Sequence, residues 1–386
     1  MNSLNFTTIF HDNISNVNLY KPEVQIPYFI KKVYNLNVVF CYVKKKKTVY
    51  RWSTDVISNF EWIKLNQFKN LCIFYINLHI IYFLIVNSKK IDILHMLHFK
   101  PSIIYWILYK LLNKNWKLYI TLDFNSKVDK SWFVMPTNFI NTFIYKIISI
   151  YCIKLDFVSL ENKEWIDLFT NYMPILRDKI IYMPFWYNKD FINKFIDNVI
   201  TDKEKIILNV CRIWTKQKNT EMILKALDWI DILDWKFYLV WPIEESFKQN
   251  IDDFFITNPW LINKVIFTWP IYDKWKLYDF FNRTKVFCLS SIMEWASPNV
   301  LSEALYFWNY LLLTDFSWAI DVTNNQNVWK IIWINDYVSL RVELMRLINW
   351  NTSFPDINKI RNFAENNYNR EILIKRIWDK LNLTNV

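Results

Sequence analysis

The sequence has no glycine among its 386 residues, and it has 21 tryptophans. Glycine makes up about 7% of average proteins, which would give roughly 27 glycines in a chain of this length. Glycine is the residue that adopts positive φ without steric penalty and lets one backbone approach another closely. Without it, tight turns, helix C-caps and close backbone approaches must be built from residues that resist these conformations.

Two interpretations of the missing glycine stay open. Asn, Ile, Lys, Phe and Tyr are abundant and Ala is scarce, as expected of an AT-rich genome. We hypothesise that many tryptophans are glycines, written as Trp because UGA encodes glycine in the source. The alternative is a real protein that dispensed with glycine. Finding UGG codons at six informative positions would exclude the hypothesis. These positions are Trp214, Trp241, Trp269, Trp295, Trp308 and Trp318.

The length suggests two domains, and an apolar content of 53% is ample for a core. The five cysteines, at positions 41, 72, 152, 211 and 288, lie in apolar surroundings without metal spacing, which indicates reduced thiols. The N-terminus lacks the basic and apolar regions of a signal peptide. The most apolar run, Leu71 to Val86, is 16 residues long, and about 20 are needed to span a membrane. We therefore expect a cytoplasmic protein in which this run is a buried strand or helix.

The net charge of +11 belongs to the first half of the chain. Residues 1–186 carry 23 Lys or Arg against 12 Asp or Glu, whereas residues 187–386 carry 24 of each. Lysine enrichment from an AT-rich genome explains this as readily as contact with an anionic membrane surface or a phosphate-bearing acceptor. Nucleic acid is a less attractive partner, because no nucleic-acid-binding motif accompanies the charge.

Strand-like and helix-like segments alternate along both halves of the chain. In the first half, strands are expected at 37–43, 91–97, 117–123, 156–161 and 179–184, with helices between them. In the second half, strands are expected at 205–210, 236–241, 264–269, 286–291, 309–315 and 331–334. This alternation is typical of doubly wound parallel sheets, so the sequence predicts an α/β protein with two Rossmann-like domains.

The stretch from Val286 to Val322 predicts a ligand site. A buried strand leads to an acidic loop and then to a helix that Ser297 can cap and Pro298 can begin. The free N–H groups of such a helix attract anions at the carboxyl end of a parallel strand, where open α/β sheets bind ligands. Two carboxylates, Glu294 and Glu303, flank the site.

This stretch resembles the donor-sugar signature of family-4-type retaining glycosyltransferases of the GT-B fold, roughly E-G-x-P-N-V-L-x-E-A-L…G-x-P…T-D…G. The matching residues are Glu294, Pro298, Asn299, Val300, Leu301, Glu303, Ala304, Leu305, Thr314 and Asp315. Trp295, Trp308 and Trp318 stand where the family has glycine. The resemblance covers about 180–340 well and 1–180 loosely.

The resemblance implies two Rossmann-like domains facing a cleft. The boundaries it suggests are 1–186 for an acceptor-side domain, 187–356 for a nucleotide-sugar domain, and 357–386 for a helical segment crossing back to the first domain. The segment 183–188, MPFWYN, resembles the family's interdomain linker, with Trp186 at a glycine position.

Residues 209–227, NVCRIWTKQKNTEMILKAL, resemble the family's segment that supplies an arginine and a lysine to the donor phosphates. Arg212 and Lys218 would stabilise the departing diphosphate, which two cations can do without a metal. Lys216 is the alternative to Lys218, because the spacing from Arg212 is one residue longer than in the commonest family pattern. Cys211 replaces a usual glycine.

By the same resemblance, Glu303 binds the donor ribose, Glu294 contacts the transferred sugar, and Asn299 and Val300 offer backbone N–H groups to phosphate. The two acids are separated by eight residues here instead of the family's seven. In the first half, His98 follows a strand where the family often has an active-site histidine. Asp123 would face the same cleft as an acceptor contact. No cluster of His, Cys or Asp has metal-ligand spacing, so neither a metal nor another cofactor is expected.

The sequence thus predicts a metal-independent, retaining glycosyltransferase that acts at the inner face of the membrane in polysaccharide biosynthesis. It would move a sugar from a nucleotide diphosphate to a hydroxyl of a glycan or lipid-linked acceptor. Two alternatives stay open. One is a nucleotide-sugar epimerase of the GT-B fold, and the other is a nucleotide- or glycan-binding module that has lost catalysis, which tryptophans filling the donor site would favour.

Overall fold

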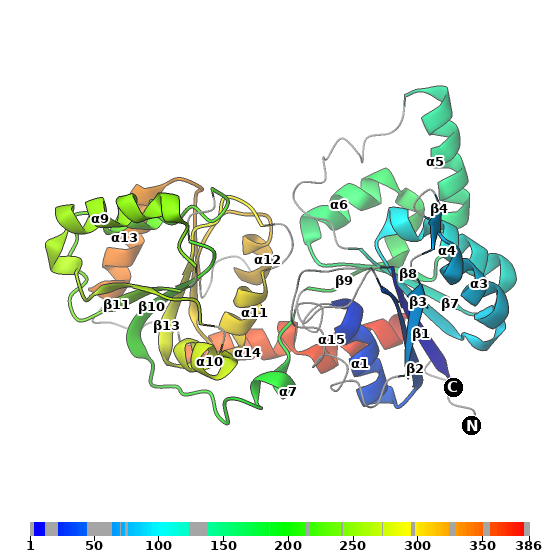
Figure 1. Cartoon of the computed structure of the whole chain (residues 1–386), viewed down its shortest axis with the longest axis horizontal. Helices are drawn as coiled ribbons and strands as arrows, with labels where there is room; N and C mark the ends of the chain where they lie inside the picture. The colour runs from blue at the N-terminus through cyan, green and yellow to red at the C-terminus, as the bar shows by residue number, and fades with distance from the viewer. Residues whose placement is uncertain are drawn as a thin grey trace. The chain divides into compact units, whose positions relative to one another are not determined.

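The computed structural model forms two compact units, each built on one parallel sheet (Figure 1). Unit 1 comprises Met1–Phe185 and Arg370–Val386, and unit 2 comprises Trp186–Asn369. The structure describes residues 4–11, 22–44, 64–69, 71–73, 76–122, 137–184, 186–213, 216–240, 242–271, 273–294, 298–323, 329–349 and 356–381.

The sheet of unit 1 has seven parallel strands in the order β3-β2-β1-β6-β7-β8-β9. Its strands are β1 (Asn5–Phe10), β2 (Asn37–Lys44), β3 (Lys64–Lys69), β6 (Ile93–Leu97), β7 (Lys117–Leu122), β8 (Phe157–Leu160) and β9 (Ile180–Tyr182). A small antiparallel pair, β4 (Cys72–Ile73) and β5 (Ile76–Asn77), accompanies it. The order reverses between β1 and β6, so the fold is doubly wound, as predicted.

The helices of unit 1 are α1 (Pro22–Tyr34), α3 (Leu78–Asn87), α4 (Phe99–Leu112), α5 (Phe139–Cys152), α6 (Lys163–Tyr172) and α15 (Arg370–Lys380). Short 3-10 turns lie at η2 (Ser88–Lys90) and η4 (Pro174–Lys179). Side chains of α3, α4, α5 and α6 share one core cluster with the sheet. The connections through α1 and α4 run in opposite directions along the sheet, so right-handed crossovers place these helices on opposite faces. On the α1 side, Tyr34 stacks on Trp378 of α15 at 4.0 Å between ring centroids.

The sheet of unit 2 has six parallel strands in the order β12-β11-β10-β13-β14-β15. Its strands are β10 (Glu204–Val210), β11 (Lys236–Val240), β12 (Val265–Thr268), β13 (Thr284–Leu289), β14 (Tyr310–Thr314) and β15 (Lys330–Ile332). Its helices are α7 (Lys189–Ile192), α8 (Thr220–Leu227), α9 (Lys248–Thr257), α10 (Lys274–Arg283), α11 (Asn299–Tyr306), α12 (Ala319–Thr323), α13 (Tyr337–Ile348) and α14 (Ile357–Tyr368). Two 3-10 turns, η5 (Glu245–Phe247) and η6 (Pro259–Leu261), flank α9.

Several details differ from the sequence-based expectations. Residues 357–382 form two helices, α14 in unit 2 and α15 in unit 1, broken at Asn369. The expected buried segment at 71–86 is wrong, because α3 buries only Ile80 and Leu84 and exposes much of its outer side. Strands β1 and β3 were not predicted at all. None of the described helices is long and apolar enough to cross a membrane.

The interior of unit 1 contains a polar network across the middle of its sheet. The ring of His95 contacts the hydroxyls of Thr8 and Thr121 at 3.1 and 3.0 Å. Thr121 donates to the Tyr119 hydroxyl, which lies 2.8 Å from Ser159 Oγ. Complete burial lowers the pKa of His95 to about 3, so the ring is neutral at physiological pH.

Four cysteines whose side chains the structure describes are free and buried, namely Cys41, Cys152, Cys211 and Cys288. Burial raises the pKa of Cys41, Cys152 and Cys211 to about 12. These thiols are therefore protonated and unreactive at neutral pH, as expected of core cysteines in a reducing environment.

Candidate active site

The candidate site in unit 2 lies where its strand order reverses, between β10 and β13. From β10 the chain builds outward to β11 and β12 on one side and to β13, β14 and β15 on the other. Loops that leave the carboxyl ends of two such strands diverge and form a ligand crevice. Arg212 and Lys218 follow β10, and Glu294 follows β13, so both predicted segments reach this point.

Lys218 and Glu294 meet directly across it. Lys218 Nζ lies 2.5 Å from Glu294 Oε1, and both side chains are largely buried. Ser291 Oγ donates to the same carboxylate oxygen at 2.5 Å. Gln217 Nε2 donates to Glu294 Oε2 at 3.4 Å and to the carbonyl of Met293 at 3.0 Å. Contact between Glu294 and a sugar would require one of these partners to move.

The two loops are also joined through their backbones. Ser290 Oγ donates to the carbonyls of Lys218 and Asn219 at 2.9 and 3.0 Å, and Ile292 N donates to Gln217 O at 2.8 Å. Asn219 has a φ of 51° and precedes α8. This bonding fixes the backbone at Lys218, so the lysine is held at the strand reversal.

The two other cations of this segment differ from Lys218. Arg212 and Lys216 are exposed, and neither has an ion pair among the described residues. Between them in sequence, residues 214 and 215 lie outside the described part of the chain. The structure therefore separates one buried, anchored lysine from two cations that stand in solvent.

Helix α11 begins five residues after Glu294, in the connection that follows β13. Asn299 and Val300 are its first residues, and its first turn contains no acid. Pro298 adopts the N-cap position with extended backbone (φ −66°, ψ 127°), so the expectation that it is the first helical residue is wrong by one position. Ser297, the predicted cap, and Trp295 lie outside the described residues. The first N–H groups of α11 remain suited to an anion.

Glu303 lies on α11 and is buried, not a surface carboxylate. Its Oε1 accepts from Lys274 Nζ at 2.9 Å and from the Tyr278 hydroxyl at 3.2 Å. Lys274 also lies over the Tyr278 ring at 5.0 Å from the centroid. Both partners come from α10. Asp273 caps the N-terminus of this helix by accepting a hydrogen bond from Trp275 N at 2.9 Å. Lys274 and Tyr278 were not predicted from the sequence, although their spacing of four places them on one helix face.

In unit 1, the corresponding reversal lies between β1 and β6, and two histidines meet there. His11 follows β1 and His98 follows β6, with their ring centroids 5.4 Å apart in an edge-to-face arrangement. His98 has φ 60° and ψ 139°, which costs a non-glycine residue about 1–3 kcal/mol. Strain of this kind is concentrated at functional sites. His11 was not singled out in the sequence, because nothing beside it in the chain marks it.

Comparison with known proteins gives the architecture a name. Neither a protein-family profile nor a curated protein sequence matches the chain. Among solved structures, it resembles a glycosyltransferase from Rickettsia africae over 100% of both chains, with a TM-score of 0.72 and 14% identity. The chain has the GT-B fold. A lipopolysaccharide outer core galactosyltransferase, WaaB, matches at a TM-score of 0.68 and 13% identity, covering 98% of this chain and 99% of that one.

Anabaena HepE in complex with UDP matches this GT-B chain at a TM-score of 0.67 and 10% identity, again covering 98% of this chain and 99% of the other. Identities this low show the fold and leave activity to be argued from the site. The remaining predicted residue, Asp123, lies outside the described residues. Within the described part of the chain, no group of three His, Cys, Asp or Glu could hold a metal ion.

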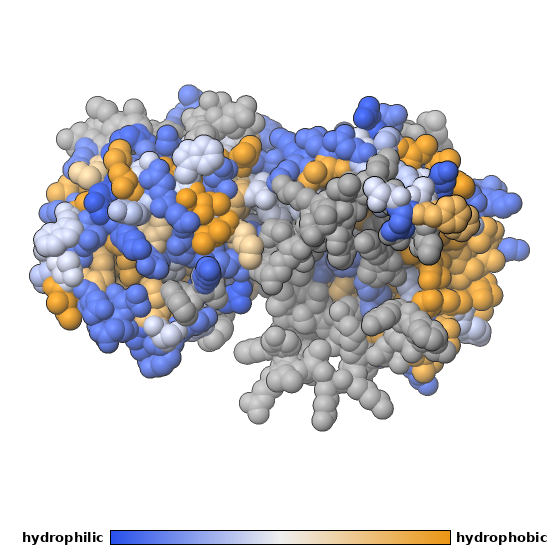
Figure 2. Space-filling model, turned by 90° about the horizontal axis from the view of Figure 1, so that it is seen from above, coloured by the Kyte–Doolittle hydropathy of each residue, from blue (hydrophilic) through white to orange (hydrophobic). Residues whose placement is uncertain are grey.

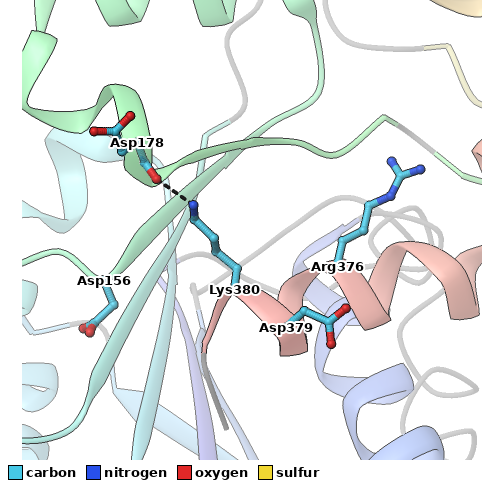
Figure 3. Close-up of a pocket in the computed structure, with 5 residues that line it drawn as sticks. All are labelled: Asp156, Asp178, Arg376, Asp379 and Lys380. Carbon is cyan, nitrogen blue, oxygen red and sulfur yellow. Dashed lines mark hydrogen bonds between the residues drawn. The ribbon is translucent and has the colours of Figure 1, made fainter. Parts of the chain in front are cut away.

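A separate cavity in unit 1 lies at the amino ends of its strands, whereas the strand reversal with His11 and His98 lies at their carboxyl ends (Figure 3). It is lined by Asp156, Asp178, Arg376, Asp379 and Lys380. Asp156 precedes β8 and Asp178 precedes β9, so the cavity is at the amino ends of these strands. Lys380 Nζ donates to the backbone carbonyl of Asp178 at 2.6 Å and ties α15 to this edge. Its acids and bases are mixed, and it does not belong to either strand reversal.

Proposed function

We propose that this GT-B protein is a retaining, metal-independent glycosyltransferase of the family-4 type that uses a nucleotide-diphosphate sugar. The observation that carries the proposal is the meeting of Lys218 and Glu294 at the strand reversal of unit 2, five residues before α11 begins. A fixed cation and free N–H groups next to each other suit a diphosphate. The acceptor hydroxyl would belong to a glycan or a lipid-linked glycan.

In this proposal each residue has one task. Glu303, positioned by Lys274 and Tyr278, accepts hydrogen bonds from the donor ribose. The N–H groups of Asn299 and Val300 bind phosphate, and Lys218 with Arg212 stabilises the negative charge that develops as the diphosphate leaves. The sugar passes through an oxocarbenium-like transition state to the acceptor oxygen, and the bond to the diphosphate breaks.

We assign Glu294 a positioning task in addition to the sugar contact that the motif implies. It forms an ion pair with Lys218 through Oε1, and Ser291 Oγ is a second donor to the same oxygen. A diphosphate carries more charge than one carboxylate, so it would attract Lys218 away from Glu294. The exchange would then free the carboxylate to meet the transferred sugar.

We further propose that glycine, encoded by UGA, stands at several of the printed tryptophans. Trp308 follows α11 with φ 55°, a conformation that favours glycine at a helix C-terminus. Trp318 is buried, and its indole N–H has no hydrogen-bond partner among the described residues. Trp269 is 90% exposed at the end of β12. Mass spectrometry of peptides from the native protein that contain these three positions tests the proposal. Tryptophan at all three positions would exclude it.

The experiment that tests the function is a donor panel. The full chain, encoded with glycine at the disputed positions, is incubated with UDP-, GDP- and ADP-sugars, and release of the nucleotide diphosphate is measured with and without glycan acceptors. We expect release with at least one donor, and its loss in Glu303→Ala and Arg212→Ala. Glu365→Ala, which changes an exposed carboxylate on α14, is the control.

The rival functions give different results in the same panel. Interconversion of the sugar without any acceptor would identify an epimerase instead. Nucleotide binding without release would identify a binding module. No binding of any nucleotide by the glycine-encoded chain would end the proposal. With a glycan acceptor that works, the anomeric configuration of the product, read by NMR, tests retention directly.

The basic first half supports a cytoplasmic enzyme working at a membrane or on a phosphate-bearing acceptor in polysaccharide biosynthesis. All of the net charge of +11 lies in residues 1–186. An anionic surface attracts such a region within about a Debye length.

A further inference from the structure

Three neighbouring helices of unit 1 expose apolar side chains that a soluble protein usually buries. We call the set the outer face of α3–α5. Its members are between 38% and 85% exposed and comprise Leu78, Tyr82, Ile85 and Val86 on α3, Ile104, Leu111 and Leu112 on α4, and Phe139, Phe143 and Ile150 on α5. Figure 2 shows a concentration of apolar surface on this unit. Contiguous apolar surface of this kind marks an interaction site.

The same helices contain no acidic residue anywhere in their sequences. Neither α3, α4 nor α5 has an Asp or Glu. Among the side chains that the structure describes on these helices and within three residues of their ends, the exposed charged ones are all lysines, at Lys89, Lys90, Lys114, Lys146 and Lys154. An apolar face bordered by lysine, with no acid within it, is the pattern of helices that lie on anionic membranes.

The other helix on this side of the sheet shows that the pattern is local. Helix α6 shares the core cluster with α3, α4 and α5, but it exposes Lys163, Asp167 and Asn171. The compositional bias of the chain toward lysine and isoleucine therefore does not by itself produce an acid-free apolar face.

The three helices lie on one side of the sheet. Helix α3 packs on α4, and α3, α4 and α5 contribute buried side chains to the same core. Figure 1 draws α3 and α4 side by side, with α5 above them in this view. The side chains that face the sheet, such as Trp106 and Leu84, are fully buried. The exposed apolar side chains therefore lie on the sides of the helices that do not face the core.

We propose that the outer face of α3–α5 docks on the surface of an anionic lipid bilayer. The apolar side chains would enter the boundary between headgroups and acyl chains, and the lysines would contact lipid phosphates. Charge complementarity selects this occupant over a second copy of the chain, because a face with only positive charge repels itself. The proposal deepens the proposed function by giving the acceptor-side unit a place to meet lipid-linked glycans.

No residue of the outer face of α3–α5 is a tryptophan. The side chains that form this face are therefore the same whichever residue the gene encodes at the Trp positions. Docking can also be measured without donor or acceptor, so its failure is distinguishable from failure of the glycosyltransferase proposal.

The test is flotation of the full chain with vesicles of phosphatidylglycerol mixed with phosphatidylcholine, compared with vesicles of phosphatidylcholine alone. We expect binding to the anionic vesicles that Phe143→Ser with Ile150→Ser weakens by about tenfold or more. The matched control is Val338→Ser with Val342→Ser on α13, which replaces equally exposed residues in unit 2. It should bind as the unchanged chain does.

A second pair of variants tests the charge. Lys89→Gln with Lys90→Gln should lower binding by about 25-fold, since each lysine near an anionic surface contributes about fivefold. Lys236→Gln with Lys359→Gln, two exposed lysines of unit 2, should have little effect. All of these variants should bind UDP as the unchanged chain does.

Three outcomes would overturn the docking proposal. The first is no binding to anionic vesicles, and the second is equal loss in the outer-face and control variants. The third is a dimer in sedimentation that Phe143→Ser with Ile150→Ser dissolves, because the face would then join two copies of the chain. Intact UDP binding alongside any of these would leave the glycosyltransferase proposal standing.

Discussion

The two units place different chemistry at the same point of the same architecture. At the strand reversal of unit 2, a lysine and a glutamate form a buried ion pair between the loops after β10 and β13. At the reversal of unit 1, two histidine rings meet between the ends of β1 and β6. Fixed charge suits a diphosphate, whereas imidazoles suit hydroxyl groups because they can both donate and accept.

The supports beneath the two reversals differ as well. In unit 2, backbone and side-chain hydrogen bonds from Ser290, Ser291 and Gln217 tie the loops together. In unit 1, the polar network of His95 includes residues of the same two strands, β1 and β6. His98, which follows β6, has a strained backbone conformation. In both units, therefore, the parallel sheet determines where the candidate site lies, and the few residues after each strand determine its chemistry.

The largest expected effect separates Lys218 from its alternative. Lys218→Met should lower kcat for sugar transfer by about 100- to 1,000-fold, because a fixed cation at the leaving diphosphate is lost. Lys216→Met removes an exposed lysine two residues away and should change kcat by less than about threefold. Steady-state kinetics of both variants decide the matter. The reverse order would move the donor cation to Lys216.

The next effect concerns donor binding in unit 2. Glu303→Gln should weaken nucleotide binding by about 10- to 100-fold, since a charged hydrogen-bond acceptor for the ribose is lost. Lys274→Met should act in the same direction through the position of Glu303, and Tyr278→Phe should act less. Calorimetric titration with UDP measures all three. Unchanged affinity in Glu303→Gln would remove this residue from the site.

A smaller effect tests the histidine pair of unit 1. His98→Gly should lower transfer by about tenfold or more while stabilising the fold by about 1 kcal/mol, because glycine adopts φ 60° without strain. UDP affinity should stay as it was. Thermal unfolding and transfer assays together give the answer. Full transfer in His98→Gly would reduce the unit 1 reversal to a structural feature.

The last prediction concerns the buried polar network of His95 in unit 1. The folded pKa of His95, about 3, lies below its unfolded value of 6.5, so the unfolded state binds the proton first as pH falls. Stability should therefore fall as pH drops from 6.5 toward 3, by at most about 1.4 kcal/mol per pH unit from this group. His95→Asn should flatten that slope in urea unfolding at pH 6.5, 5.5 and 4.5. Equal slopes would contradict the neutral buried ring.

Much of the fold could be predicted from sequence pattern. Every predicted strand of unit 2 overlaps an observed one, because buried parallel strands are short apolar runs followed by helical segments. Strand β1 was missed because its Asn and Thr residues hide the apolar run, yet Thr8 is buried against His95. The exposure of α3 could not be predicted, because a run that is apolar on nearly every side does not indicate which side faces the core.

The site was predicted unevenly for a physical reason. Lys218, Glu294 and Glu303 belong to local motifs, so their neighbourhood is visible in the chain. The partners Lys274 and Tyr278 precede Glu303 by 29 and 25 residues, and His11 precedes His98 by 87. Only the strand order brings these residues together, and strand order is a property of the folded sheet.

Hydrogen–deuterium exchange of the glycine-encoded chain with UDP, GDP or ADP tests the central claim most directly, because it reports where a nucleotide binds. We predict that at least one nucleotide protects residues 216–219, the segment after β13 up to Glu294, and the first turn of α11. The peptides around Asp178 and Arg376 should be unaffected. Protection confined to unit 1, or no protection by any of the three nucleotides, would contradict the account.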